Sequence, residues 1–141
     1  MNLEKLMAEH DRIDVAIAAL AASIANEEPN TAAVTCALFD LNNELTEHLA
    51  HEDSFIYPKM IGGKNAAGAA TARQFVKDFE NLRTEWDNYL VEWQPECIEH
   101  DWAHFRESTV WMTDQLSKRV SAENTLLYTA ALKSGSITLR D

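Results

Sequence analysis

The sequence is poor in residues that turn or cross-link a chain, with four glycines, three prolines and two cysteines among 141 residues. Because glycine and proline interrupt helices while alanine, leucine and glutamate favour them, this composition predicts long helices with few breaks. Cys36 and Cys97 stand in no CxxC spacing, so they predict no disulfide framework and agree with a reducing compartment. The length suits a single domain with a sizeable core.

Positive charge is also scarce, since 12 basic residues face 23 acidic ones and the formal net charge is −11. No basic cluster offsets this balance locally, and a nucleic acid would be repelled. The apolar run over residues 15–25 is too short to span a bilayer, and acidic residues precede it where a secretion signal needs positive charge. We expect a cytoplasmic protein with no membrane or nucleic-acid partner. A protein partner and the oligomeric state are left open.

Apolar residues recur at spacings of three and four along four stretches, which is the pattern of amphipathic helices. We expect Thr31 to cap the second helix and Pro58 to end it. The fourth helix is long enough to be bent or divided. The predicted helices cover about residues 2–26, 31–58, 75–93 and 98–130.

Short connections between these helices require antiparallel neighbours. The predicted fold is therefore all-α, an up-down-up-down antiparallel four-helix bundle. We assign residues 1–133 to the bundle and residues 134–141 to a polar, irregular C-terminal tail.

Polar residues interrupt the apolar stripes of the first, second and fourth predicted helices. In the second and fourth helices the two interrupting residues are four apart, so they share one face. The stripes resume at Phe55 and Leu126, which we therefore expect in the core. The interrupting residues are His10, then His48 and Glu52, then Arg119 and Glu123.

Antiparallel threading brings all three interruptions to the same end of the bundle. Ionised groups left alone in a core cost several kcal/mol each, so these side chains should pair with one another or hold a metal. The HxxxE pair by itself is a weak motif in an acidic helix, and ordinary buried polar residues are the alternative.

These residues carry a resemblance to a known family. The segments EHDRID, HLAHEDSFIYP and RVSAENTLLYTAAL are similar, in order and separation, to the histidine and HxxxE elements of hemerythrin-like, or HHE cation-binding, domains. The resemblance extends to about Lys133. It implies a helical bundle in which five histidines and two bridging carboxylates hold two non-haem irons. In this sequence it implies metal ligands at His10, His48, Glu52 and Glu123.

Three histidines of that ligand set have no counterpart here. Arg119 stands where the fourth helix should supply one, and the third helix has no histidine but carries Phe75 and Phe79 four apart on its stripe. The remaining ligands are too few for an ordinary di-iron centre. We therefore expect a protein that is not an enzyme and does not carry oxygen reversibly.

Two states are left open. In the first, the four implied ligands hold at most one metal, iron or another divalent ion at low occupancy, and the protein senses iron or an oxygen-derived ligand. In the second, no metal binds, and Arg119 closes the site as the counter-ion of Glu52 and Glu123. The protein would then be a regulatory or scaffold bundle.

Other polar residues are weaker candidates. Three could support the ligands by hydrogen bonds from outside, although a solvated surface explains them more simply; they are Asp14, Glu44 and His51. Cys97, His100 and His104 share one helix face at spacings that zinc could use. They form at most a weak second metal site, because a solvated helix face also accounts for them.

Overall fold

The computed structural model describes residues 1–140, and nearly all of them are helical, which confirms the all-α class. Two π-helical turns, η1 (Glu52–Ile56) and η2 (Glu123–Leu127), each join two α-helices without a break. No helix among the described residues is both long and apolar enough to cross a membrane. The α-helices are α1 (Leu3–Ser23), α2 (Thr31–His51), α3 (Tyr57–Ile61), α4 (Ala66–Glu92), α5 (Pro95–His100), α6 (Trp102–Ala122) and α7 (Tyr128–Lys133).

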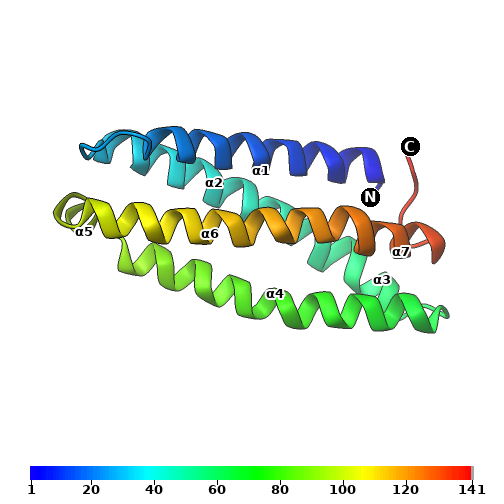
Figure 1. The fold of residues 1–141 in the computed structure, drawn as a ribbon. Helices are drawn as coiled ribbons and strands as arrows, with labels where there is room; N and C mark the ends of the chain where they lie inside the picture. The colour runs from blue at the N-terminus through cyan, green and yellow to red at the C-terminus, as the bar shows by residue number, and fades with distance from the viewer. Residues whose placement is uncertain (141) are drawn as a thin grey trace.

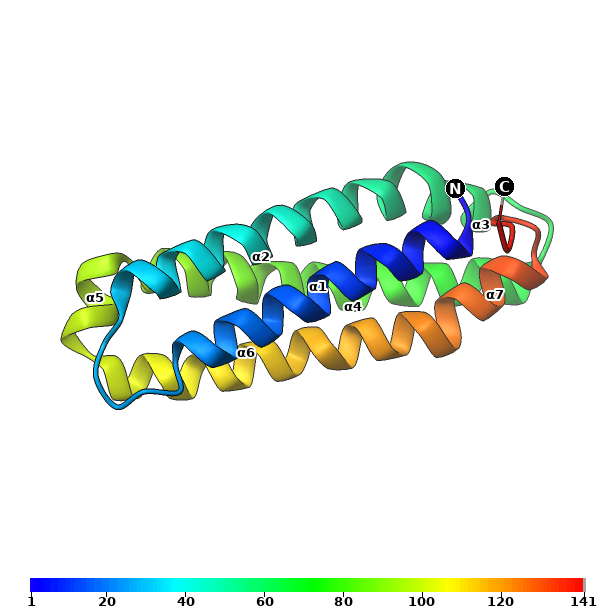
Figure 2. The same cartoon turned by 90° about the horizontal axis from the view of Figure 1, so that it is seen from above.

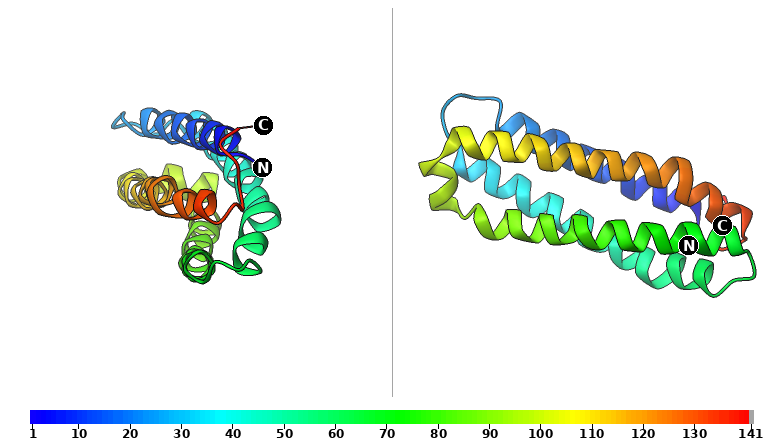
Figure 3. Two further views of the ribbon diagram at one scale, coloured as in Figure 1. Left: turned by 90° about the vertical axis from the view of Figure 1, so that its right-hand side faces the viewer. Right: turned by 60° about the horizontal axis from the view of Figure 1, so that its bottom comes forward.

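The long helices lie roughly along one direction and alternate in sense. In Figure 1, α1 runs leftward from the N-terminus, α2 returns, α4 runs leftward again and α6 returns. Figure 2 shows the loop after α1 and the short helix α5 together at one end. The two chain ends, α3 and α7 lie at the other end, as Figure 3 also shows.

Asparagine side chains start three of the helices. Asn2 accepts a hydrogen bond from the backbone N–H of Lys5, Asn30 from that of Ala33, and Asn65 from that of Gly68. Such caps satisfy backbone donors that the first turn of a helix leaves free. The predicted cap at Thr31 is therefore wrong by one residue, because Thr31 is already the first residue of α2.

The two π turns change which side chains face the core. Each closes with a hydrogen bond that spans five residues and so contains one residue more than an α-helical turn. Ile56 and Leu127 are consequently fully buried, whereas Phe55 is 45% exposed and Leu126 is 59% exposed. The prediction that Phe55 and Leu126 lie in the core is wrong. Pro58 does not end the second helix either, which continues through α3.

Two apolar clusters make up the core, and the polar interruptions fall between them in sequence. The larger cluster includes Ile13 and Leu45, which lie on one side of the interruptions in α1 and α2. The smaller cluster includes Leu6 and Ile56, on their other side, close to the chain ends. The bundle thus holds a polar layer between two apolar ones.

Residues 134–140 form no regular helix, and they pack against the bundle. Thr138 accepts a 2.7 Å hydrogen bond from the backbone N–H of Leu3, and Leu139 accepts one of 3.2 Å from Glu4. These carbonyls satisfy two of the free donors at the start of α1. The side chain of Ile137 is 4% exposed and belongs to the smaller apolar cluster.

The packing of this segment predicts a specific stability effect. Ile137→Ala should lower the free energy of unfolding by about 2–4 kcal/mol, since it removes buried methylene groups and leaves a cavity. Leu139→Ala, at a side chain that is 66% exposed, is the matched control and should change it by less than about 0.5 kcal/mol. Urea unfolding followed by circular dichroism measures both, and equal effects would show that Ile137 is not part of the core.

Candidate metal centre

Three buried electron-pair donors from three helices meet at one point. The Nε2 atoms of His10 and His48 lie 3.1 Å apart, and Oε1 of Glu123 lies 2.9 Å from the first and 3.0 Å from the second. All three side chains are nearly inaccessible to solvent. These distances bring residues 10, 48 and 123 together, as the antiparallel threading of the helices predicts.

The other nitrogen of each imidazole is hydrogen-bonded away from this point. Nδ1 of His48 lies 2.8 Å from Oε1 of Glu9, and Nδ1 of His10 lies 2.7 Å from Oδ1 of Asn124. A carboxylate can only accept, so Nδ1 of His48 carries the proton. With Nδ1–H donated outward on both rings, each neutral imidazole presents an Nε2 lone pair to the meeting point. Metal-binding histidines are typically held in this way.

Glu52 and Tyr128 complete the buried cluster. Oε1 of Glu52 lies 3.4 Å from Nε2 of His48 and forms no hydrogen bond with any described residue, although its side chain is fully buried. The hydroxyl of Tyr128 lies 3.0 Å from Nε2 of His10 and 3.3 Å from an oxygen of each glutamate, Glu52 and Glu123. That hydroxyl has one proton to donate among several acceptors.

The pKa values of the buried groups show how their charges are balanced when no metal is bound. Burial alone would lower the pKa of His48, but the surrounding carboxylates of Glu123, Glu52 and Glu9 outweigh it and raise the pKa to about 12. Burial and the nearby charge of Glu123 raise the pKa of Glu52 to about 8. Burial also opposes ionisation of Glu123, yet hydrogen bonds from the two histidines hold its pKa well below the usual range. The metal-free cluster therefore keeps protons on His48 and Glu52 that these two groups would otherwise lose, while Glu123 stays ionised.

Arg119 binds Oε2 of Glu123, whereas the two imidazoles contact Oε1. Its Nε donates to Oε2 of Glu123 at 2.6 Å, Nη1 donates to the backbone oxygen of Phe75 at 3.0 Å, and Nη2 donates to the hydroxyl of Tyr57 at 2.8 Å. The guanidinium carbon lies 4.7 Å from the ring centre of Phe75 and 5.1 Å from that of Phe79. Hydrogen bonds and cation–π contacts thus fix Arg119 in place. It forms no hydrogen bond to Glu52, but the charge of Glu52 adds to that of Glu123 in raising the pKa of Arg119.

The buried residues fit one divalent ion. With neutral imidazoles, the carboxylates of Glu9, Glu52 and Glu123 against the single guanidinium of Arg119 leave two negative charges, which one divalent ion would balance. Neighbouring ligands of an octahedral ion at roughly 2.1 Å are about 3.0 Å apart, close to the observed separations. The free Oε1 of Glu52 offers a further donor. The ligand atoms of His10, His48 and Glu123 all lie within 4.8 Å of one another, and Glu52, which is not part of that group, would join them as a fourth ligand from its position 3.4 Å from His48.

Several residues of the cluster were missed from sequence. A signal for the tyrosines existed, because HxxxExxxxY over residues 48–57 recurs as RxxxExxxxY over residues 119–128. Five-residue spacing is off the face in an α-helix, but the π turns bring Tyr57 and Tyr128 to the glutamate face. The sequence gives no comparable signal for Glu9 and Asn124, because each is only adjacent in sequence to a residue of the polar interruptions, His10 or Glu123.

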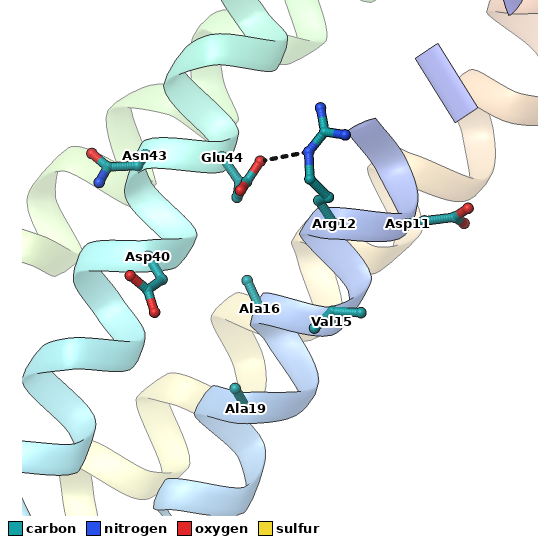
Figure 4. Close-up of a pocket in the computed structure, with 8 residues that line it drawn as sticks. All are labelled: Asp11, Arg12, Val15, Ala16, Ala19, Asp40, Asn43 and Glu44. Carbon is teal, nitrogen blue, oxygen red and sulfur yellow. Dashed lines mark hydrogen bonds and ion pairs between the residues drawn. The ribbon is translucent and has the colours of Figure 1, made fainter. Parts of the chain in front are cut away.

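The three outer candidates have different positions. Nδ1 of His51 is hydrogen-bonded to Oε2 of Glu9, whose other oxygen is hydrogen-bonded to His48, so Glu9 stands between His51 and the buried ligands. Glu44 instead pairs with Arg12 at 3.3 Å beside a surface hollow between α1 and α2 (Figure 4). Asp14 is exposed. The structure thus places neither Asp14 nor Glu44 in contact with the cluster.

The cysteine and two histidines of the weak second site are all exposed and line a surface hollow at the α5 end. Among the described residues, the ligand atoms of these three side chains do not all lie within 4.8 Å of one another. His104 instead lies 3.5 Å from Asp101 and packs its ring edge against Trp93. The structure therefore does not bring Cys97, His100 and His104 together around one ion.

Comparison with known proteins bears on this arrangement. No curated protein and no solved structure matches the chain. The family model described as Hemerythrin HHE cation binding domain matches residues 1–135, which is almost the whole chain and includes every residue of the buried cluster. This match confirms the resemblance seen in the sequence: the chain belongs to the hemerythrin HHE cation-binding domain family.

Proposed function

We propose that this protein binds a single divalent transition metal, iron in the first place, inside an up-down four-helix frame, and that it senses iron or a small ligand of iron. The observation that carries the proposal is the meeting of three electron-pair donors within 3.1 Å, next to a buried carboxylate oxygen that has no hydrogen-bond partner among the described residues. Such a group of acceptors needs positive charge among them, and a metal ion supplies it without the protonation of His48 and Glu52. Imidazole and carboxylate donors together suit iron and its neighbours better than magnesium or calcium.

The proposal is limited to one metal because of Arg119. Oε1 of Glu123 faces the two imidazoles, whereas Oε2 is bound to the guanidinium. Glu123 therefore still bridges two positive positions, and a fixed side-chain cation takes one of them. A guanidinium is always charged, so a second ion beside it would be repelled. With two imidazoles in place of five, we propose neither reversible oxygen carriage nor catalysis.

A bound iron would supply a redox-active centre at these residues. The protein residues would hold and shield that centre. Tyr128, whose pKa is raised by burial and by the neighbouring glutamates, stays protonated and donates a hydrogen bond into the cluster. Glu9 and Asn124 keep both imidazole rings oriented. The cytoplasmic location and the lack of a nucleic-acid partner stay predictions of the sequence.

A second candidate function is a metal-free regulatory or scaffold bundle. It is favoured by one observation, the three hydrogen bonds that fix Arg119 beside Glu123. In this state the remaining charge is balanced by protons on His48 and Glu52, whose raised pKa values allow it.

Metal content separates the two functions. Protein expressed in iron-supplemented medium should carry about one equivalent of metal by elemental analysis, and the double variant His48→Gln, Glu52→Gln should carry almost none. A matched control is His104→Gln, Glu107→Gln, at exposed positions of α6, which should keep the full amount. Less than about a tenth of an equivalent in the unmodified protein, with no charge-transfer absorption in air, would rule out the metal-binding function.

Arg119→His tests the restriction to one metal. Removing the fixed cation from Oε2 of Glu123 and adding a donor should raise the affinity for iron or zinc at least about tenfold or add a second ion. Arg73→His, at an exposed position of α4, is the control and should leave binding unchanged. If the unmodified protein binds metal as well as the Arg119→His variant does, Arg119 does not restrict the site.

The pKa shifts predict how stability depends on pH. Between about pH 5 and 8 the unfolded chain ionises Glu52, whose ordinary pKa is 4.5, while the folded protein keeps that proton. His48 acts in the same direction above its ordinary pKa of 6.5. Each proton kept only by the folded state costs up to about 1.4 kcal/mol per pH unit, so metal-free protein should lose stability as pH rises.

A bound divalent ion replaces those protons, so zinc should oppose this loss more strongly at pH 8 than at pH 5.5. Thermal unfolding in chelator and in excess zinc at both pH values measures the effect. A melting temperature that rises from pH 5.5 to pH 8 in chelator would contradict the predicted protonation of the cluster.

A further inference from the structure

A second group of metal-type ligands lies on the surface side of the buried cluster. Ligand atoms of Glu9, Glu47 and His51 all lie within 4.8 Å of one another. Glu9 is buried, the side chain of His51 is 31% exposed, and Glu47 is exposed. We call these three residues the outer cluster. It shares only Glu9 with the network around the buried site.

Helix geometry explains why these side chains meet. Glu47 and His51 are four apart on α2, so they lie one above the other on one stripe of that helix. Glu9 reaches them from the neighbouring helix α1, with Oε2 turned to His51 and Oε1 turned inward to Nδ1 of His48. The two oxygens of Glu9 therefore face in different directions, one towards each cluster.

The charges and donor types at the outer cluster favour a cation. Glu47 forms no hydrogen bond or ion pair with another described residue, so its carboxylate is uncompensated beside that of Glu9. The chain as a whole carries a formal charge of −11. Two carboxylates and one imidazole are ligands that zinc, ferrous iron and manganese accept, whereas magnesium and calcium prefer oxygen alone.

We propose that Glu9, Glu47 and His51 form a second, solvent-accessible binding site for a divalent transition metal. The protein supplies three donors, and water completes the coordination, so this site binds more weakly than the buried one. Its ion would lie beside Oε2 of Glu9, whereas Oε1 of Glu9 is turned to His48 and the buried cluster.

Zinc stoichiometry tests this site on the full chain after removal of bound metal by chelator. Isothermal titration and native mass spectrometry should give two zinc ions in the unmodified protein and one in Glu47→Gln, His51→Gln. The matched control Glu44→Gln, His100→Gln removes the same groups at surface positions and should keep two. Equal stoichiometry in the unmodified protein and in Glu47→Gln, His51→Gln would overturn the proposal.

The same titration separates this proposal from the function proposed above. If only the outer site exists, the unmodified protein binds one zinc ion and Glu47→Gln, His51→Gln binds none. If only the buried site exists, both bind one. Manganese gives an independent readout, because an ion open to solvent strongly enhances the relaxation of water protons. That enhancement should fall at least about fivefold in Glu47→Gln, His51→Gln, and an unchanged enhancement would place the manganese elsewhere.

Discussion

The constraint on which the structure depends is that several acceptor groups meet in a space where little can donate to them. Two imidazole nitrogens and the carboxylates of Glu52 and Glu123 lie between two apolar clusters, away from solvent. Buried charge without a partner costs far more than a hydrogen bond returns, so positive charge must be present as protons, as a guanidinium or as a metal ion. Arg119 supplies part of that charge permanently. The remainder is what a divalent ion or two protons can supply, and this choice governs the chemistry of the centre.

Arg119 also links three helices around the buried cluster. Its guanidinium packs on the rings of Phe75 and Phe79, donates to the backbone of α4 and donates to Tyr57 beyond η1. A histidine in its place could not make these contacts, and histidines in place of the phenylalanines would lie against a cation. The arginine, the two aromatic rings and the phenol therefore form one unit, which holds Glu123 from outside while the imidazoles hold it from inside.

The π turns account for most of what sequence reasoning misplaced. An α-helical period extrapolated through Glu52 and Glu123 puts Phe55 and Leu126 in the core, and both are exposed. One extra residue in each turn rotates the chain, so that Ile56 and Leu127 are buried in place of Phe55 and Leu126. The same rotation brings the tyrosine five residues after each glutamate to the site. Periodicity describes regular helices, and it fails where a π turn makes the helix irregular.

The sequence by itself determined the helical class, the family, and the meeting of residues 10, 48 and 123, because apolar spacing fixes which helix faces turn inward and antiparallel threading fixes which ends coincide. Only the tertiary structure decided that Arg119 binds one oxygen of Glu123 and not Glu52, that Glu9 orients His48, and that Glu44 pairs with Arg12 instead. The reason is physical: a spacing pattern specifies the face of a residue to within a turn, whereas a hydrogen bond or a metal ligand depends on atomic positions that neighbouring helices set.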